Sequence, residues 1–185
     1  MRNSLMNRLI AALAVAVLAS FAADAALAQH SMKQSLDNLV VWRDGLASSA
    51  QPGREDFQKV KDQGYQMVIN LAPPQSQGSV DIEGSLVASR GLAYVNIQVD
   101  FRNPTAANFK LFSDVVKAGA GWKILVHCQV NMRASSFSFL YRVIHEGAPV
   151  NDAVAKLSGV WSPDPVWKKF IEETLAASGR KVELL

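Results

Sequence analysis

Short apolar runs alternate with helical patterns along most of the chain. The runs with the length and residue types of strands are 46–49, 67–71, 94–97 and 123–126. The segments with apolar residues at helical spacing are 54–63, 81–89, 105–118, 134–145, 151–157 and 165–177. Because strands and helices alternate, the sequence predicts one α/β domain with a central, mostly parallel sheet flanked by helices.

Two neighbouring segments are expected to lie at the centre of this domain. Residues 124–126 are apolar without alternation, which is typical of a strand covered on both faces. The helix at 134–145 is apolar nearly all round, which predicts that it is buried. Residues 129–133 must then form a strand-to-helix loop at the carboxyl edge of the sheet, where open α/β proteins bind ligands.

The only cysteine of the chain, Cys128, immediately precedes this loop. Backbone N–H groups at a helix start favour an anion, and the guanidinium of Arg133 can hold two of its oxygens. The positive surroundings favour an accessible, reactive thiolate, which suits covalent transfer of a phosphoryl or related group. The alternative is a buried structural cysteine. The candidate anion-binding residues are Gln129, Val130, Asn131, Met132, Arg133 and Ala134.

His127, Cys128 and Arg133, in "HCQVNMR", resemble the signature of the cysteine-dependent phosphatases. The chain is more closely similar to the bacterial beta-lactamase-hydrolase-like, phosphatase-like domains of the protein tyrosine and dual-specificity phosphatase superfamily. The similarity runs from about Ser48 to Phe170 and includes "INLAPP", "VDFRNPTAANF" and "WSPDPVW". The resemblance implies a protein tyrosine phosphatase-like fold.

The loop is one residue shorter than in typical tyrosine phosphatases. Those enzymes have five residues between Cys and Arg, a glycine among them, and Ser or Thr after the Arg. Here four residues without glycine separate Cys128 from Arg133, and Ala134 follows. The shorter loop occurs both in the phosphatase-like family named above and in rhodaneses.

The resemblance also implies roles for residues outside the loop. Asp100 lies 28 residues before Cys128, after a predicted strand, and would be the general acid and base; the alternative is a solvated or capping carboxylate. His127 would support the loop. Ser135 or Ser136 would either donate a hydrogen bond to the cysteine sulfur or be an ordinary serine of the first helical turn. Asn70 ends a neighbouring strand and either lines the pocket or satisfies backbone groups.

The resemblance therefore implies a metal-independent phosphatase that hydrolyses phosphate monoesters, phosphotyrosine among them, through a phosphocysteine intermediate. Its expected substrate is a phosphorylated small molecule or a phosphoprotein, and no cofactor is expected. A rhodanese-like sulfurtransferase that uses a Cys persulfide is one alternative. A non-catalytic domain that binds an anion or a partner is another.

The N-terminus predicts export. A basic start, an uncharged stretch at 9–23 and the Ala-Leu-Ala of residues 26–28 are typical of a secretory signal peptide, 1–28, cleaved after Ala28. We therefore expect a periplasmic or secreted protein without a stable membrane anchor after cleavage. A polar lead-in, 29–45, would precede the phosphatase-like domain at 46–178.

Charge and histidine placement narrow the expected partners. The net charge of +3 includes no run of five like charges, so nucleic acid is not indicated. A single cysteine excludes an internal disulfide, and the three histidines are not at metal-ligand spacing. The sequence thus predicts no metal site.

Overall fold

The computed structural model describes residues 36–180, whose centre is a five-stranded sheet in the order β1-β2-β5-β3-β4. The strands are β1 (Val40–Arg43), β2 (Leu46–Ser49), β3 (Met67–Asn70), β4 (Ala93–Asn96) and β5 (Ile124–His127). Only β1 pairs antiparallel, with β2, and the other pairs are parallel. The predicted α/β class with a mostly parallel sheet is confirmed.

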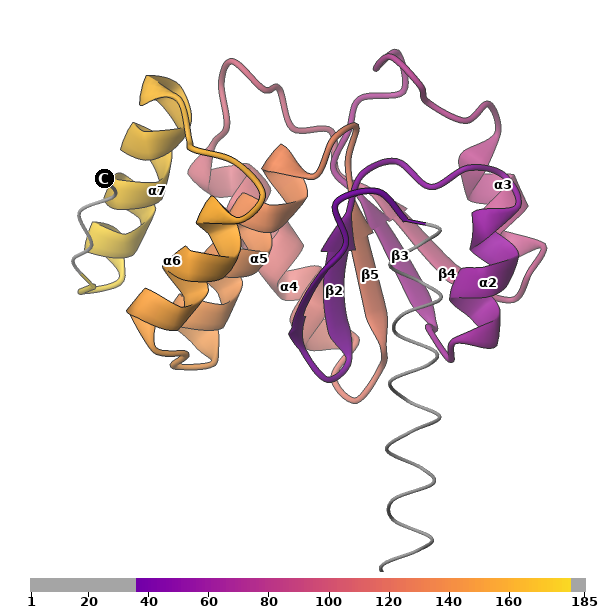
Figure 1. Cartoon of the computed structure of the whole chain (residues 1–185), viewed down its shortest axis with the longest axis horizontal. Helices are drawn as coiled ribbons and strands as arrows, with labels where there is room; N and C mark the ends of the chain where they lie inside the picture. The colour runs from indigo at the N-terminus through magenta and orange to yellow at the C-terminus, as the bar shows by residue number, and fades with distance from the viewer. Residues whose placement is uncertain (1–35, 181–185) are drawn as a thin grey trace, which may run out of the picture. The chain divides into compact units, whose positions relative to one another are not determined.

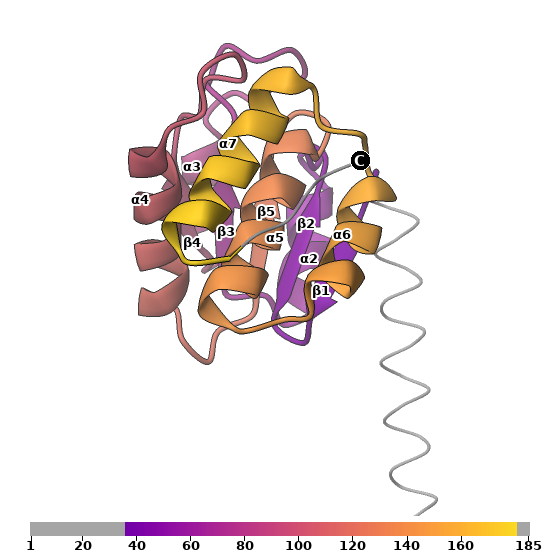
Figure 2. The same ribbon diagram turned by 90° about the vertical axis from the view of Figure 1, so that its left-hand side faces the viewer.

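Helices cover both faces of the sheet. They are α2 (Asp56–Asp62), α3 (Glu83–Ala88), α4 (Ala106–Ala118), α5 (Met132–His145), α6 (Val150–Ser158) and α7 (Pro165–Ala177). Helices α2 and α3 lie on one side of the sheet, and α4 to α7 lie on the other (Figure 1). Figure 2 shows the second side, with α7 in front of α5 and with α4 and α6 on either side.

The larger part of the core lies between the sheet and this second helical layer. Its aromatic centre consists of Phe109 and Phe112 from α4, Phe137 from α5, and Trp167 and Phe170 from α7. Every residue of α5 from 133 to 141 is buried, and so is all of β5. The strand and helix that flank Cys128 are therefore central, as predicted.

The domain begins earlier than the sequence pattern predicted. Residues 40–43, assigned to the polar lead-in, form β1, and Leu36 before them is only 2% exposed. The apolar run at 39–42 is as long as the other strands, and the Asp44–Gly45 turn that joins it to β2 has the Asp-Gly composition of a tight hairpin. The predicted start at residue 46 is thus too late, because β1 completes one edge of the sheet.

The predicted signal peptide, 1–28, lies outside the described residues. Within residues 36–180, the structure contains no helix with the length and apolar character that crossing a membrane requires.

Candidate active site

The parallel strands end in a row of polar residues at one edge of the sheet. Ser49 and Asn70 are both in register with His127, and Asn96 is in register with Asn70. The chain turns from His127 through Cys128 into α5 at this edge, and the loops that follow β3 and β4 lie there as well (Figure 1). The predicted cysteine loop therefore stands at the carboxyl edge of the sheet.

Two carbonyl groups of the loop are held by the segments that flank β1 and β2. Gln129 O accepts from Gln51 N at 3.2 Å, and Val130 O accepts from Asn38 Nδ2 at 3.4 Å. In return, Asn131 Nδ2 donates to Asn38 O at 2.6 Å. These bonds fix the carbonyl side of the loop against the rest of the domain.

The N–H side of the loop is less fully paired. Val130 forms an isolated antiparallel bridge with Ala50, but among residues 36–180 the backbone N–H groups of 129 and 132–134 donate no hydrogen bond to another residue. Ala134 is nonetheless fully buried, and buried N–H groups in proteins almost always have an acceptor. Consecutive free donors at the start of a 14-residue helix are suited to bind an anion.

Asn131 explains how this loop turns without a glycine. Its φ of 71° places it in the left-handed region, which asparagine enters more readily than other side-chain-bearing residues. Asn131 occupies the N-cap position of α5, but its side chain makes no capping bond and reaches Asn38 instead. The residue therefore combines the loop's left-handed turn with an anchor to the segment before β1.

Arg133 places a positive charge beside the free N–H groups. The residue is 8% exposed, its Nε donates to Val99 O at 2.9 Å, and its guanidinium carbon lies 5.2 Å from the ring centre of Phe101. Within the described part of the chain, no carboxylate pairs with Arg133 and its two Nη atoms form no hydrogen bond. A buried charge needs a counter-charge, so the free side of the guanidinium is suited to an anionic ligand.

The thiol itself is less accessible than predicted. Cys128 is 0% exposed, and its N–H donates to Ser49 O at 3.4 Å. Its side chain belongs to the same core cluster as those of Ile124 and Val126, because alternate residues point to the same face of a strand. The expectation of an exposed thiolate is therefore wrong.

Asp100 lies on an exposed loop at the rim of the site. Its Oδ1 accepts from Arg102 N at 2.9 Å, which ties the carboxylate to its own turn. The carbonyls on either side of Asp100 are both held, Val99 O by Arg133 and Phe101 O by Trp167 Nε1 at 2.9 Å. The structure thus connects the loop of Asp100 directly to the arginine of the cysteine loop.

The serines at the start of α5 do not contact sulfur. Ser135 Oγ and Ser136 Oγ donate to Met132 O, at 3.2 Å and 2.8 Å. The predicted hydrogen bond from either serine to the sulfur of Cys128 is not formed, because both hydroxyls bond back to the first turn of the helix.

His127 is part of a buried polar network that the sequence analysis missed. Its Nε2 lies 3.0 Å from Oε1 of Glu83, which is 6% exposed. Asn70 Nδ2 donates to the same oxygen at 3.0 Å, and Gln51 Nε2 donates to Oε2 at 2.5 Å. Burial alone would raise the pKa of Glu83, but the hydrogen bond and charge of His127, with bonds from Gln51 and Tyr94, lower it.

Asn70 satisfies a backbone group, which is one of the two roles considered for it, and that it lines the pocket stays a prediction. Its Oδ1 accepts from Ala72 N at 2.8 Å while its Nδ2 bonds to Glu83. Glu83 carries no comparable signal in the sequence, because an acidic residue at the start of a helix is an ordinary feature. Only the three-dimensional structure shows that it faces His127.

No group of three His, Cys, Asp or Glu residues within 36–180 is arranged to hold a metal ion. The described site brings together a buried thiol, a set of free N–H groups beside the unpaired Arg133, and the loop of Asp100.

Comparisons with known proteins identify the fold. No protein-family model and no curated protein matches the chain. The crystal structure of a candidate phosphatase (DUF442) from Shewanella putrefaciens CN-32 matches with a TM-score of 0.74 and 30% identity, over 80% of this chain and 97% of that one. A second crystal structure with the same description has a TM-score of 0.70 and 31% identity, over 78% and 92%.

Two more distant structures share the fold. The core catalytic domain of a PP-IP phosphatase from S. cerevisiae has a TM-score of 0.62 and 15% identity, over 74% of this chain and 85% of that one. TpbA from P. aeruginosa, in complex with pTyr, has a TM-score of 0.55 and 15% identity, over 65% and 72%. The narrower beta-lactamase-hydrolase-like resemblance is not tested by these matches and stays a prediction. The identity and coverage shared with the Shewanella protein show that the chain belongs to the DUF442 family, and the more distant matches show that it has a protein tyrosine phosphatase-like fold.

Proposed function

We propose that this protein is an exported, metal-independent phosphatase that hydrolyses phosphate monoesters through a phosphocysteine intermediate. The observation that carries the proposal is the set of free N–H groups at 129 and 132–134 beside the unpaired guanidinium of the buried Arg133. Both kinds of donor suit the oxygens of a tetrahedral phosphate, and both belong to the segment that directly follows Cys128.

The proposed reaction has two steps. In the first, Cys128 Sγ attacks phosphorus and the bond from phosphorus to the leaving oxygen breaks, while Asp100 donates a proton to that oxygen. In the second, Asp100 takes a proton from water, the resulting hydroxide attacks phosphorus, and the S–P bond breaks to release inorganic phosphate. The N–H groups and Arg133 hold the non-bridging oxygens throughout, where charge accumulates.

The substrate is proposed only as a class. The similar structures are described with different phosphate compounds, PP-IP for the yeast enzyme and pTyr for TpbA. We therefore propose a phosphorylated small molecule or a phosphoprotein, with phosphotyrosine among the candidates. The proposal that the enzyme acts in the periplasm or outside the cell rests on the signal-like residues 1–28.

The burial of Cys128 favours a second candidate function, a domain that binds an anion without turnover. In that case the free N–H groups and Arg133 would recognise the anion, and the thiol would be a structural residue of the core. The sulfurtransferase alternative rests on the short Cys–Arg spacing, whereas the phosphatase descriptions of the similar structures support phosphoryl chemistry.

One comparison of wild type with Cys128→Ser separates the three functions. Reduced protein is incubated with an aryl phosphate and, separately, with thiosulfate and cyanide, and tungstate binding is measured by calorimetry. We expect phosphate release by the wild type alone and tungstate binding by both proteins. Thiocyanate formation would establish the sulfurtransferase, and tungstate binding without any turnover would establish the binding domain.

A further inference from the structure

We propose that Glu83 is a positioning residue that holds the cysteine loop in shape through His127 on one side and Gln51 on the other. This inference rests on the proposed function. Glu83 lies on α3, distant in sequence from the loop, and makes no contact that the proposed reaction uses.

The first connection runs through the residue that precedes the nucleophile. His127 Nε2 lies 3.0 Å from Glu83 Oε1, and both side chains are buried, at 0% and 5% exposure. Because a carboxylate can only accept, Nε2 must carry the hydrogen in this contact, so Glu83 specifies the tautomer and the ring orientation of His127. His127 Nδ1 is buried without a partner among the described residues, so this contact alone orients the ring.

The second connection reaches the loop through Gln51. The Gln51 side chain donates to Glu83 Oε2 at 2.5 Å, and the Gln51 backbone N–H donates to Gln129 O at 3.2 Å. The two oxygens of a single carboxylate are therefore linked to positions on both sides of Cys128. This placement would hold the residues on either side of Cys128, His127 and Gln129, in a fixed position.

The backbone before Glu83 is strained in a way that local contacts do not explain. Ile82 has φ 54° and ψ 28°, a left-handed conformation that is unusual for a β-branched residue. Ile82 is 71% exposed, so packing of its side chain does not compensate for the strain. Strain of this kind persists where the surrounding structure gains from it, and here it starts α3 so that Glu83 faces the sheet.

Few charged groups surround the pair. Tyr94 is the other titratable side chain in contact with the network, through Asn70 Nδ2 at 3.3 Å, and burial raises its pKa so that it stays neutral. Phe57 of α2 packs edge-on against the His127 ring, with 6.3 Å between ring centres. The described surroundings thus leave Glu83 as the charged partner of His127.

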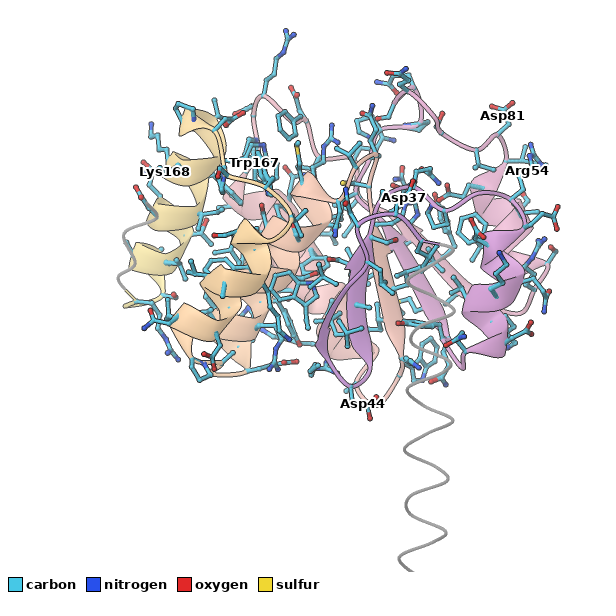
Figure 3. All side chains as sticks on the ribbon, in the orientation of Figure 1. Asp37, Asp44, Arg54, Asp81, Trp167 and Lys168 are labelled. Atoms are coloured by element: carbon cyan, nitrogen blue, oxygen red, sulfur yellow. The ribbon has the colours of Figure 1, made fainter. Side chains whose placement is uncertain are left out.

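The test compares Glu83→Gln with Asp81→Asn, a matched loss of one carboxylate two residues away. Asp81 is exposed and lies at the surface in Figure 3, and it contacts Arg54 only through its backbone oxygen. We expect Glu83→Gln to lower kcat/KM and tungstate affinity by about tenfold or more, the usual effect of losing a hydrogen bond to a charged group, and Asp81→Asn to change neither.

A spectroscopic readout separates positioning from a general loss of stability. The wild type should show a downfield, exchange-protected Nε2 proton of His127 in ¹H–¹⁵N NMR spectra, and this signal should move upfield in Glu83→Gln. If Glu83→Gln does not fold, Gln51→Met serves instead, because it keeps the backbone bond to Gln129 while removing the side-chain donor. An unchanged His127 signal in Glu83→Gln, a changed signal there with wild-type kcat/KM and tungstate affinity, or wild-type kcat/KM and tungstate affinity in Gln51→Met would overturn the proposal.

Failure of the proposed function gives a different result. If the wild type turns over no phosphate ester, the phosphatase proposal fails, and tungstate affinity with the His127 signal still decides the role of Glu83. A loss of tungstate affinity in Glu83→Gln together with the upfield shift would then support a positioning role in an anion-binding site.

Discussion

Arg133 and Val99 join the two loops of the candidate active site, because Arg133 Nε donates to Val99 O at 2.9 Å. Val99 directly precedes Asp100, the candidate general acid. The residue that would bind phosphate thus also holds the backbone of the loop that would supply the proton. A lysine has neither the Nε donor nor the planar fork, so it cannot make both contacts.

We therefore expect Arg133→Lys to impair the enzyme far more than the loss of one phosphate contact would suggest. The kcat/KM for an aryl phosphate should fall by about 10²–10³-fold, the usual effect of removing a donor from an oxyanion site. Arg102→Lys is the control, since Arg102 is exposed on the same loop and only its backbone N–H contacts Asp100. Equal kinetics for Arg133→Lys and Arg102→Lys would contradict the proposal that Arg133 holds the phosphate oxygens.

Asp100→Asn tests the general acid by its dependence on the leaving group. An asparagine can still accept from Arg102 N, so the turn should survive. Loss of the acid should slow alkyl or tyrosyl phosphates by about 10²–10⁴-fold and nitrophenyl phosphate less, because nitrophenolate leaves without a proton. The measurement is kcat/KM over a series of leaving groups.

The control for this series is Asp37→Asn. Asp37 is an exposed carboxylate near the upper edge of the sheet in Figure 3, and only its backbone oxygen has a described partner, Ala50 N. Asp37→Asn should leave the whole series unchanged. Equal, small losses across all leaving groups in Asp100→Asn would mean that Asp100 only shapes its loop.

Asn131 offers a prediction about stability. Alanine is strained at φ 71°, whereas glycine is not, so Asn131→Ala should be less stable than Asn131→Gly by about 1 kcal/mol. Both variants lose the bond to Asn38 O, so that difference isolates the backbone conformation. The free energy of unfolding is measured in urea.

Asn151 provides a control with the opposite sign. It is exposed within α6, where glycine is less favourable than alanine by about 0.5–1 kcal/mol. Asn151→Gly should therefore be the less stable of its pair. The same order of alanine and glycine at both positions would show that the left-handed conformation of Asn131 does not matter for stability.

The central elements were predictable because their patterns are local and strong. An unbroken apolar run next to a helix that is apolar all round can only be placed at the centre, and β5 and α5 are buried as expected. The same pattern placed Cys128 and its loop at the carboxyl edge of the sheet. The pattern did not indicate whether the thiol is accessible. Accessibility depends on whether the Cys128 side chain points to the side of the sheet that packs in the core.

The network around Glu83 could not be predicted for a different reason. Its members come from α3, β5, the end of β3 and the residue after Ala50, and each is an ordinary polar residue in its own segment. Only the parallel register that places Asn70 beside His127 brings them together. Edge strand β1 was missed although its apolar run at 39–42 is as long as the strand, because the run was counted with the polar residues that surround it.

The lowered pKa of Glu83 leads to a prediction about stability in acid. A carboxyl group whose pKa is lower in the folded than in the unfolded protein contributes stability that is fully present above the unfolded value, about 4.3 for glutamate. That contribution is lost as the pH falls through the lower, folded value. Glu83→Gln lacks it at every pH. The free energy of unfolding of the wild type should therefore exceed that of Glu83→Gln at pH 7, and the difference should shrink steadily below about pH 4.

Urea unfolding at a series of pH values measures this, and Asp81→Asn should follow the wild type throughout, because Asp81 is exposed. A difference between wild type and Glu83→Gln that stays constant from pH 7 to strong acid would mean that the charge of Glu83 contributes nothing to folding, and that its buried hydrogen bonds alone account for its position.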